Sequence, residues 1–234
     1  LPKSQLSFSE WEIGIIYQPL FSVSGDIYDI YSDENKLQGI SLFDVSGHGV
    51  SSALITMIAQ SIAFRNYKKG KDKLLTAIAN KFNKEITIDL ENIDNYLTGI
   101  ILRFQENQIE YVNGGHPDLL HWNIEKNIVT GASENKENYG NPFFGFLLNE
   151  WDYEMITFTV QKGDFIIGYT DGLTEMANND NKAFELDGII KTILQANPKI
   201  SPQQLCDKIV NNADQFAEGK KRTDDLTCIV LKKL

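Results

Sequence analysis

Four aspartates stand where the pattern of the chain changes between strand and loop. Asp26 follows a Ser-Gly turn, Asp44 and Asp171 each end an apolar run, and Asp224 precedes the last apolar run. Strand ends at one edge of a sheet can converge although they are distant in sequence, and carboxylate oxygens are the ligands that Mg²⁺ and Mn²⁺ prefer. The pattern therefore suggests a divalent-metal site, although an aspartate beside a glycine is also typical of a plain turn.

Such a site has a clear chemical use. Two hard cations about 3.5–4 Å apart can share one carboxylate and one water, and that water then loses a proton more readily. Without metal, crowded carboxylates would repel one another and raise some of their pKa values. A water activated in this way is a nucleophile at neutral pH, which suits hydrolysis.

Composition excludes several other classes of function. The net charge of −10 argues against nucleic acid as the main partner. The two cysteines and three histidines have neither disulfide-framework nor zinc spacing, which suits a reducing, cytoplasmic compartment. No apolar run approaches the roughly 18–20 residues of a membrane span, and the start has no secretory signal. Since the chain lacks an initial Met, we expect it to be part of a longer protein. Regions upstream of this chain could tether that longer protein to a membrane.

Apolar periodicity predicts two helices directly after Asp44. The first covers residues 50–65, and the second covers residues 72–85 with Asp72 as its cap. The predicted buried face of the first helix consists of Val50, Ala53, Leu54, Met57, Ile58 and Ile62. That of the second consists of Leu74, Ala77, Ile78 and Phe82. A shift of either helix would move Asp44, so the pair is a candidate route for a regulatory signal.

The remaining chain reads mainly as strands, with a second pair of helices. Strands are predicted at residues 11–15, 39–43, 96–104, 108–113, 119–122, 153–160, 164–169 and 226–231, and a polar surface loop at 125–141. Residues 184–196 look helical, and Ser201, Pro202 and Gln204 mark another helix start, with an apolar face of Leu205, Ile209, Ala213 and Phe216. Strands in blocks and helices in pairs favour an α+β sandwich with mostly antiparallel sheets and helices outside.

Five ordered blocks resemble the bacterial metal-dependent protein phosphatases of the sporulation and stress-response type, the SpoIIE-like, RsbU-like branch of the PPM superfamily. They are Ser24-Gly25-Asp26-Ile27-Tyr28-Asp29, Asp44-Val45-Ser46-Gly47-His48-Gly49, Asn113-Gly114-Gly115-His116-Pro117, Gly163-Asp164 with Tyr169-Thr170-Asp171-Gly172-Leu173-Thr174-Glu175, and Thr223-Asp224-Asp225-Leu226-Thr227. Ser24 and Gly115 depart from the usual pattern, and Thr98-Gly99-Ile100 stands where a Thr-Ala-Phe-like strand is common. None of these departures removes a proposed ligand.

The resemblance implies a fold, a reaction and roles. The fold is a four-layer α-β-β-α sandwich of two central antiparallel sheets flanked by helix pairs, and residues 1–234 would be one catalytic domain. The reaction is hydrolysis of phosphoserine or phosphothreonine in a protein, with two Mn²⁺ or Mg²⁺ ions activating the attacking water. Asp44 would bridge the ions and the Val45 carbonyl would add a ligand. Asp171 and Asp224 would hold one ion, and Asp26 would serve the other directly or through water.

Other residues of the motifs favour structural interpretations. His48 is a candidate general acid, but its place between two glycines at a helix start is better explained by packing and capping. His116 before Pro117 is interpreted as a turn residue, and Cys228 as a core residue. Glu175 is interpreted equally as a residue that orients water and as one that caps a turn. Asp225, next to Asp224, is interpreted as a residue that supports the metal ligands.

The family's usual partner is a phosphorylated STAS-type anti-anti-sigma factor, and the resemblance also implies an upstream sensor module. The oligomeric state is open, with a homodimer as one option. Two other hypotheses remain: a non-catalytic regulatory module on the same fold, and hydrolysis of a small phosphoester. Absence of manganese binding would favour the non-catalytic module.

Overall fold

The computed structural model describes residues 5–47, 49–91, 95–134, 140–145 and 151–234. The chain divides into two compact units, each built from segments distant in sequence. Residues 21–116 and 136–159 form unit one, and residues 2–20, 117–135 and 160–234 form unit two. No helix among the described residues has both the length and the apolar character that a membrane span requires.

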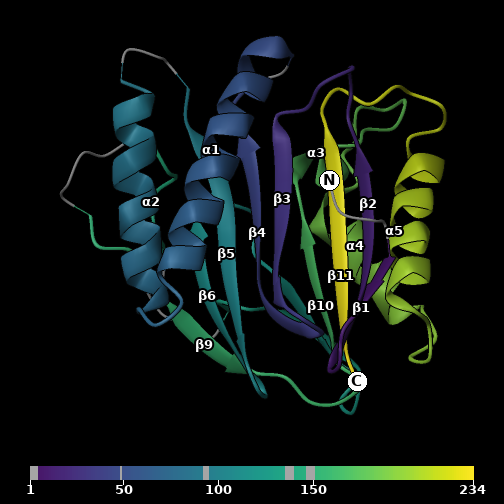
Figure 1. Ribbon diagram of the computed structural model, residues 1–234. Coiled ribbons are helices and arrows are strands. Elements are labelled where there is room, and N and C mark those ends of the chain that lie inside the picture. Colours follow the sequence, from purple (N-terminus) through teal and green to yellow (C-terminus); the bar gives the residue numbers. More distant parts are fainter. Residues whose placement is uncertain (1–4, 48, 92–94, 135–139, 146–150) are drawn as a thin grey trace. The chain divides into compact units, whose positions relative to one another are not determined.

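Unit one is a five-stranded antiparallel sheet with two helices on one face (Figure 1). The strand order is β3 (Asp26–Asp33), β4 (Lys36–Val45), β5 (Leu97–Gln105), β6 (Gln108–Gly114) and β9 (Ile156–Thr159). The helices are α1 (Val50–Lys69) and α2 (Leu75–Asp89). Their core against the sheet includes Phe43, Phe82 and Phe144, whose rings lie within 4.8–6.0 Å of one another.

Unit two is a six-stranded antiparallel sheet with its own helix pair. The strand order is β1 (Gln5–Ser7), β2 (Trp11–Gln18), β11 (Leu226–Lys233), β10 (Phe165–Tyr169), β7 (Leu120–Asn123) and β8 (Ile128–Gly131). The pair consists of α4 (Glu185–Leu194) and α5 (Pro202–Phe216), and a further one-turn helix, α3 (Asp171–Thr174), follows β10. The predicted α+β class, with antiparallel sheets and a helix pair for each, is confirmed.

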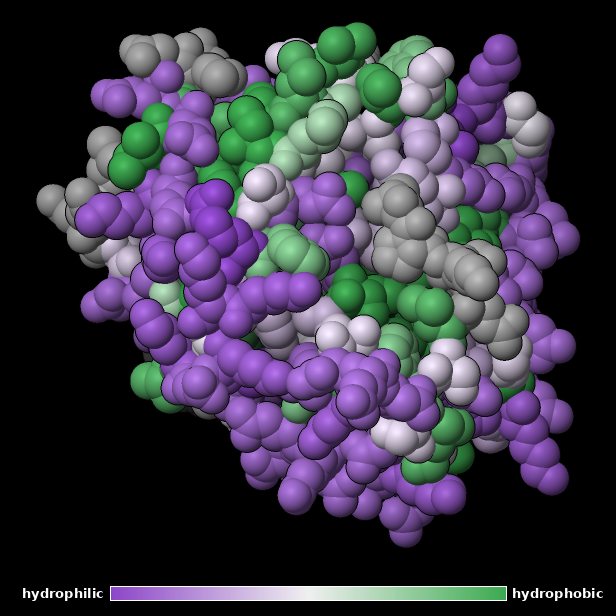
Figure 2. Space-filling view, in the orientation of Figure 1, coloured by the Kyte–Doolittle hydropathy of each residue, from purple (hydrophilic) through white to green (hydrophobic). Residues whose placement is uncertain are grey.

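The buried face of α1 differs from the predicted one. Val50, Leu54 and Met57 are 71%, 59% and 68% exposed, whereas Ile55, Ala59 and Ala63 are buried against the sheet. Of the predicted face, only Ile62 belongs to the core. Figure 2 shows the resulting apolar surface over the upper part of α1.

The start of α2 was also predicted wrongly. The helix begins at Leu75 and not at Asp72, its flanking residue is Leu74, and no side chain caps it. Leu74 is 68% exposed, while Ile78 and Phe82 are buried as predicted. A third correction concerns residues 125–141, because β8 lies within the segment predicted to be a loop.

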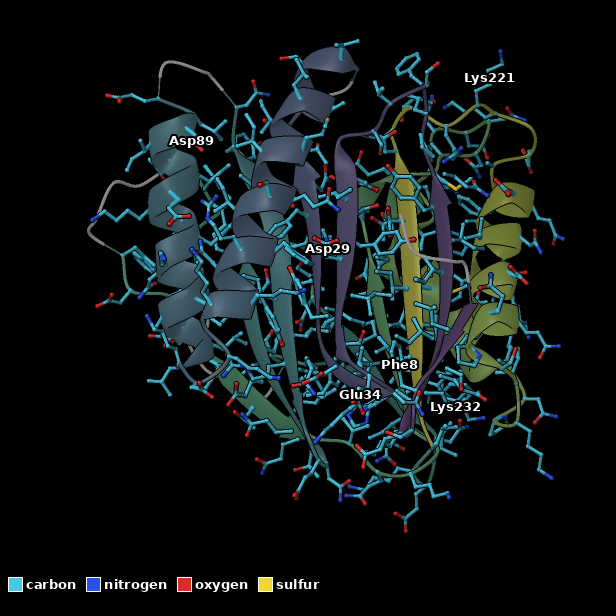
Figure 3. The ribbon with its side chains drawn as sticks, viewed as in Figure 1. Phe8, Asp29, Glu34, Asp89, Lys221 and Lys232 are labelled. Carbon is cyan, nitrogen blue, oxygen red and sulfur yellow. The ribbon has the colours of Figure 1, made fainter. Side chains whose placement is uncertain are left out.

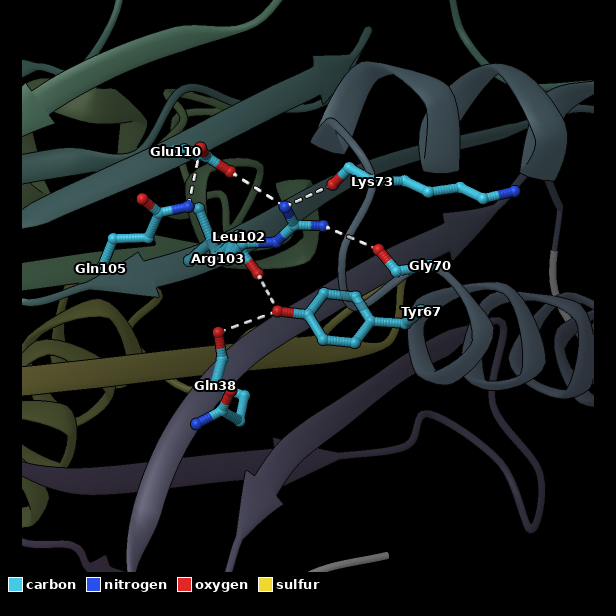
Figure 4. A network of polar contacts seen from close by, with 8 residues as sticks. All are labelled: Gln38, Tyr67, Gly70, Lys73, Leu102, Arg103, Gln105 and Glu110. Carbon is cyan, nitrogen blue, oxygen red and sulfur yellow. Dashed lines mark hydrogen bonds and ion pairs between the residues drawn. The ribbon is translucent and has the colours of Figure 1, made fainter.

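The turn between α1 and α2 is attached to the sheet by polar contacts (Figure 4). Arg103 on β5 donates to the backbone oxygens of Lys73 and Gly70, at 2.6 and 3.4 Å. The Tyr67 hydroxyl donates to the Gln38 carbonyl at 2.8 Å and to the Leu102 carbonyl at 3.3 Å. The Gly70 carbonyl belongs to the residue that caps the C-terminus of α1, where backbone oxygens lack partners within the helix. The bonds of Arg103 and Tyr67 together fix the hairpin to β4 and β5.

The predicted start of α5 is confirmed in detail. The Ser201 hydroxyl accepts the backbone N–H of Gln204 at 3.2 Å, and the Gln204 side chain accepts the N–H of Ser201 at 3.1 Å. We expect Ser201→Ala to lower the free energy of unfolding by about 1 kcal/mol, since one helix N–H loses its acceptor. Urea unfolding measures this, with exposed Lys199→Ala as the control; equal stability of the two variants would contradict the prediction.

Candidate functional site

Asp26 and Asp44 lie directly opposite each other in unit one. Asp26 is the first residue of β3 and only 2% exposed, and its register partner on β4 is Asp44. Directly opposed residues of an antiparallel pair project from the same face, and like charges in this arrangement are destabilising. Their neighbours Ile27 and Phe43 belong to the core beneath the helices, so the two aspartates lie on the sheet face opposite α1 and α2. A bound cation would remove their repulsion.

The backbone at this end of β4 packs tightly on the turn before Asp26. A Cβ on Gly25 would lie 3.1 Å from the Val45 carbonyl oxygen, closer than most real Cβ contacts. The Gly25 carbonyl accepts the N–H of Val45 at 3.2 Å and the hydroxyl of Thr56 at 3.0 Å. The structure thus holds the Val45 carbonyl next to the Asp26 turn, at the same end of the sheet as the carboxylate pair.

Asp29 belongs to the same sequence block as Asp26 but faces the other way. It lies on β3 with odd-numbered Ile27 and Tyr31, which pack in the core under the helices, and its carboxylate accepts from Gln60 of α1 at 3.0 Å. Figure 3 labels it on β3, beside α1. Burial raises the pKa of Asp29, and the bond from Gln60 opposes that shift.

Asp171 and Asp224 are the second pair, in unit two. Asp171 begins α3 directly after β10, and Asp224 precedes β11, the antiparallel neighbour of β10. A Cβ on Gly172 would lie only 1.9 Å from the Asp225 carbonyl oxygen. Glycine is therefore required for the start of α3 to approach the Asp224–Asp225 segment this closely.

The pKa of Glu175 indicates that Asp171 and Asp224 both lie near this residue. Its pKa is raised, first by burial and then by the negative charges of Asp171 and Asp224. The charges of Asp171 and Asp224 thus both disfavour the ionised form of Glu175 in unit two. This is the condition under which bound metal would stabilise the charged forms.

The donors in each unit suit a hard divalent cation. Carboxylate oxygens, with a backbone carbonyl nearby in unit one, are the ligand type that Mg²⁺ and Mn²⁺ take. Within the described ranges, no group of three or more histidine, cysteine, aspartate or glutamate side chains is arranged to hold a metal ion. In unit one the structure places Asp26 opposite Asp44, and in unit two Asp171 and Asp224 both lie near Glu175.

The remaining motif residues have structural contacts. Asp225 is buried, and its carboxylate accepts the N–H of Leu20 at 2.6 Å. Cys228 is a buried core residue of β11, as predicted. His116 is 6% exposed and bonds Thr98 at 2.9 Å. His48 lies outside the described residues. Thr98 was missed as a site residue, although its position opposite Asp44 would follow from pairing the two strands in register.

A comparison with protein families gives the context of these residues. The model of the family described as stage II sporulation protein E (SpoIIE) matches residues 35–233, which include Asp44, Asp171 and Asp224. The chain belongs to the SpoIIE family. This confirms the resemblance that the five sequence blocks carried.

Similar proteins support the SpoIIE-family assignment. Phosphoserine phosphatase RsbP of Bacillus subtilis is 25% identical over 94% of this chain, which spans 51% of that protein, about half its length. The solved SiaA-PP2C domain of Pseudomonas aeruginosa has a TM-score of 0.80 at 16% identity, over 94% of this chain and 85% of that one. The catalytic domain of serine/threonine protein phosphatase PstP, solved with two manganese ions, has a TM-score of 0.64 at 13% identity, over 96% and 99%. The two solved structures show that this chain has the PP2C fold.

Proposed function

We propose that this SpoIIE-family chain is a metal-dependent phosphoprotein phosphatase that hydrolyses phosphoserine or phosphothreonine. The observation that carries the proposal is the opposition of Asp26 and Asp44 on adjacent strands, and Asp44 lies within the residues that the family model matches. The curated relative RsbP is a phosphoserine phosphatase, and the PstP domain was solved with manganese. Both support hydrolytic metal chemistry on this fold.

The proposed metal ligands are all oxygen donors. Asp44 is proposed to bridge two Mn²⁺ or Mg²⁺ ions, with the Val45 carbonyl as a further ligand. Asp26 serves one ion, directly or through water, and Asp171 and Asp224 hold the other. When bound, such ions lower the pKa of water and neutralise charge on a phosphoryl group.

The chain's own contribution is to fix the backbone that carries these carboxylates. In unit two, the Asp171 backbone carbonyl accepts the N–H of Glu175 at 2.8 Å and the hydroxyl of Thr174 at 3.0 Å, which fixes the backbone of Asp171 at the start of α3. The Asp224 carboxylate accepts the N–H of Asp225 at 2.8 Å, which holds the carboxylate against the backbone of the next residue. Preorganised groups of this kind lose little entropy when substrate binds.

The substrate that the family resemblance favours is a phosphorylated STAS-type anti-anti-sigma factor. This chain has a net charge of −10, so it repels the phosphate group of a phosphoprotein. Cations bound at the site would offset that repulsion. Three further predictions accompany this proposal. They are an upstream sensor module, a homodimer, and a single catalytic domain over residues 1–234.

The test measures phosphate release from a serine-phosphorylated STAS domain, with nitrophenyl phosphate as a small comparison substrate. We expect activity to disappear with EDTA and to return with Mn²⁺ or Mg²⁺. Calorimetry with Mn²⁺ alone separates the alternatives. No heat of binding and no phosphate release would favour the non-catalytic module, and release from nitrophenyl phosphate alone would favour a small-ester hydrolase.

A further inference from the structure

A row of polar residues crosses three neighbouring strands of unit one. Asp44 on β4 is opposed by Asp26 on β3 and by Thr98 on β5. The side chains of directly opposed residues project from one face with Cβ atoms about 4.5–5.5 Å apart. Leu97, the neighbour of Thr98, packs in the core on the helix side. Thr98 therefore lies beside Asp44 on the same face of the sheet as Asp26. Asp26 is on β3, on one side of Asp44, and Thr98 is on β5, on the other side.

His116 is held against this row by its own loop. Its Nδ1 and the Thr98 hydroxyl are 2.9 Å apart. Asn113, at the end of β6, accepts the N–H of His116 at 2.7 Å and donates to its carbonyl at 2.8 Å. The single Asn113 side chain thus binds both backbone groups of His116, so the imidazole is positioned by a closed turn and not by solvent.

Glycines allow this turn to approach β5. Gly115 has a φ of +67°, a left-handed conformation that L side chains rarely adopt, and it forms a bridge with Gly99 of β5. A Cβ on Gly114 would lie 2.3 Å from the Phe144 ring, and one on Gly99 would lie 2.1 Å from the Phe43 ring. The bridge between Gly115 and Gly99 therefore brings the turn against β5, while Gly114 and Gly99 leave room for the two phenylalanine rings.

We propose that His116 and Thr98 are positioning residues for Asp44, a role that rests on the proposed function of Asp44 as a metal ligand. A threonine hydroxyl has one proton to donate and two lone pairs to accept with. If Nδ1–H of His116 donates to the Thr98 oxygen, the Thr98 proton is available to the Asp44 carboxylate. One Asp44 oxygen is then held and the carboxylate plane is fixed for metal. Contacts that orient metal ligands in this way are worth about 10–100-fold in metal affinity.

Manganese affinity measured by calorimetry on the full chain tests the proposal. Thr98→Val keeps the shape of the side chain and removes the hydroxyl, and Thr98→Ser keeps the hydroxyl. We expect Thr98→Val to weaken Mn²⁺ binding about 10–100-fold, and Thr98→Ser to stay within about threefold of the native chain. Thermal unfolding in EDTA checks that both variants are folded.

The partner residue gives an independent comparison that remains available if Thr98→Val does not fold. His116→Ala is expected to weaken Mn²⁺ binding by a similar factor, and His116→Asn, whose amide can donate from near the Nδ1 position, to restore part of it. The double variant should be no weaker than either single one, because both changes break one chain of contacts. Native-like Mn²⁺ affinity in Thr98→Val or in His116→Ala would overturn the proposal.

The outcomes also separate this role from others. A native chain that binds no Mn²⁺ would overturn the proposed function itself, whereas native binding with unchanged variants would overturn only the positioning role. If His116→Ala lost kcat with unchanged Mn²⁺ affinity and a changed pH profile, His116 would act on substrate as a general acid, and the positioning role would be wrong.

Discussion

Asp44→Asn is expected to lower the rate of phosphoserine hydrolysis at least about 100-fold with saturating Mn²⁺. Changes in the groups that merely orient metal ligands cost 10–100-fold, and loss of the bridging carboxylate should cost no less. Asparagine preserves the size of the side chain, so the strand pair with Asp26 can persist. The same change also removes the repulsion between the opposed carboxylates, so we expect the variant to unfold at a temperature equal to or above that of the metal-free native chain.

Asp29→Asn is the matched control for this prediction. Asp29 lies on the same strand and in the same sequence block as Asp26, but its side chain meets Gln60 under α1. Its pKa is already raised by burial, so a neutral amide costs little there. We expect phosphate release and Mn²⁺ affinity within about threefold of the native chain, given the small effects usual away from a site. Near-native activity of Asp44→Asn would refute the metal role, and equal losses in both variants would point to a folding defect.

Local signals in the sequence predict those elements whose ends are marked by particular side chains. The start of α5 follows from Ser201, Pro202 and Gln204, because the capping box is a local pattern of hydrogen bonds. The hairpin of β5 and β6 follows from two apolar runs separated by a short polar turn. In both cases the partners lie within a few residues of one another.

The buried face of α1 could not be predicted in the same way. Two apolar stripes run along this helix, and periodicity cannot say which of them meets the sheet. The stripe with small and aromatic residues, such as Ala59, Ala63 and Tyr67, packs on β3 and β4, because small side chains allow the helix to lie close to the strands. The bulkier stripe with Leu54 and Met57 stays exposed.

The site shows the same division between local and distant signals. The sequence blocks identify Asp26 and Asp44, and the pairing of β3 with β4 places the two residues opposite each other. Thr98 stood outside the blocks, and only the pairing of β4 with β5 places it beside Asp44. His116 was interpreted as a turn residue, which its bonds with Asn113 support, but its contact with Thr98 links that turn to the carboxylate row.

Gly172→Ala is expected to damage the second carboxylate pair and the stability of unit two together. The added Cβ would lie 1.9 Å from the Asp225 carbonyl oxygen and 3.0 Å from its carbon, so backbone must move away from backbone. Overpacking of this kind costs about 1–3 kcal/mol, and in a chain of this size each kcal/mol lowers Tm by about 2–4 °C. Because the shift separates Asp171 from Asp224, we also expect half-maximal activity to require at least about tenfold more Mn²⁺.

Gly140→Ala is the control, because a Cβ there meets no atom of the described residues within 4 Å and the backbone is not left-handed. Its Tm and its Mn²⁺ requirement should match those of the native chain, since surface changes usually alter stability by less than about 0.5 kcal/mol. A lower Tm for Gly172→Ala with an unchanged Mn²⁺ requirement would mean that the close approach serves folding only, and that Asp171 and Asp224 do not act as a pair. An unchanged Tm would contradict the packing itself. A parallel fall in stability and metal affinity is the result expected if one backbone contact sets both.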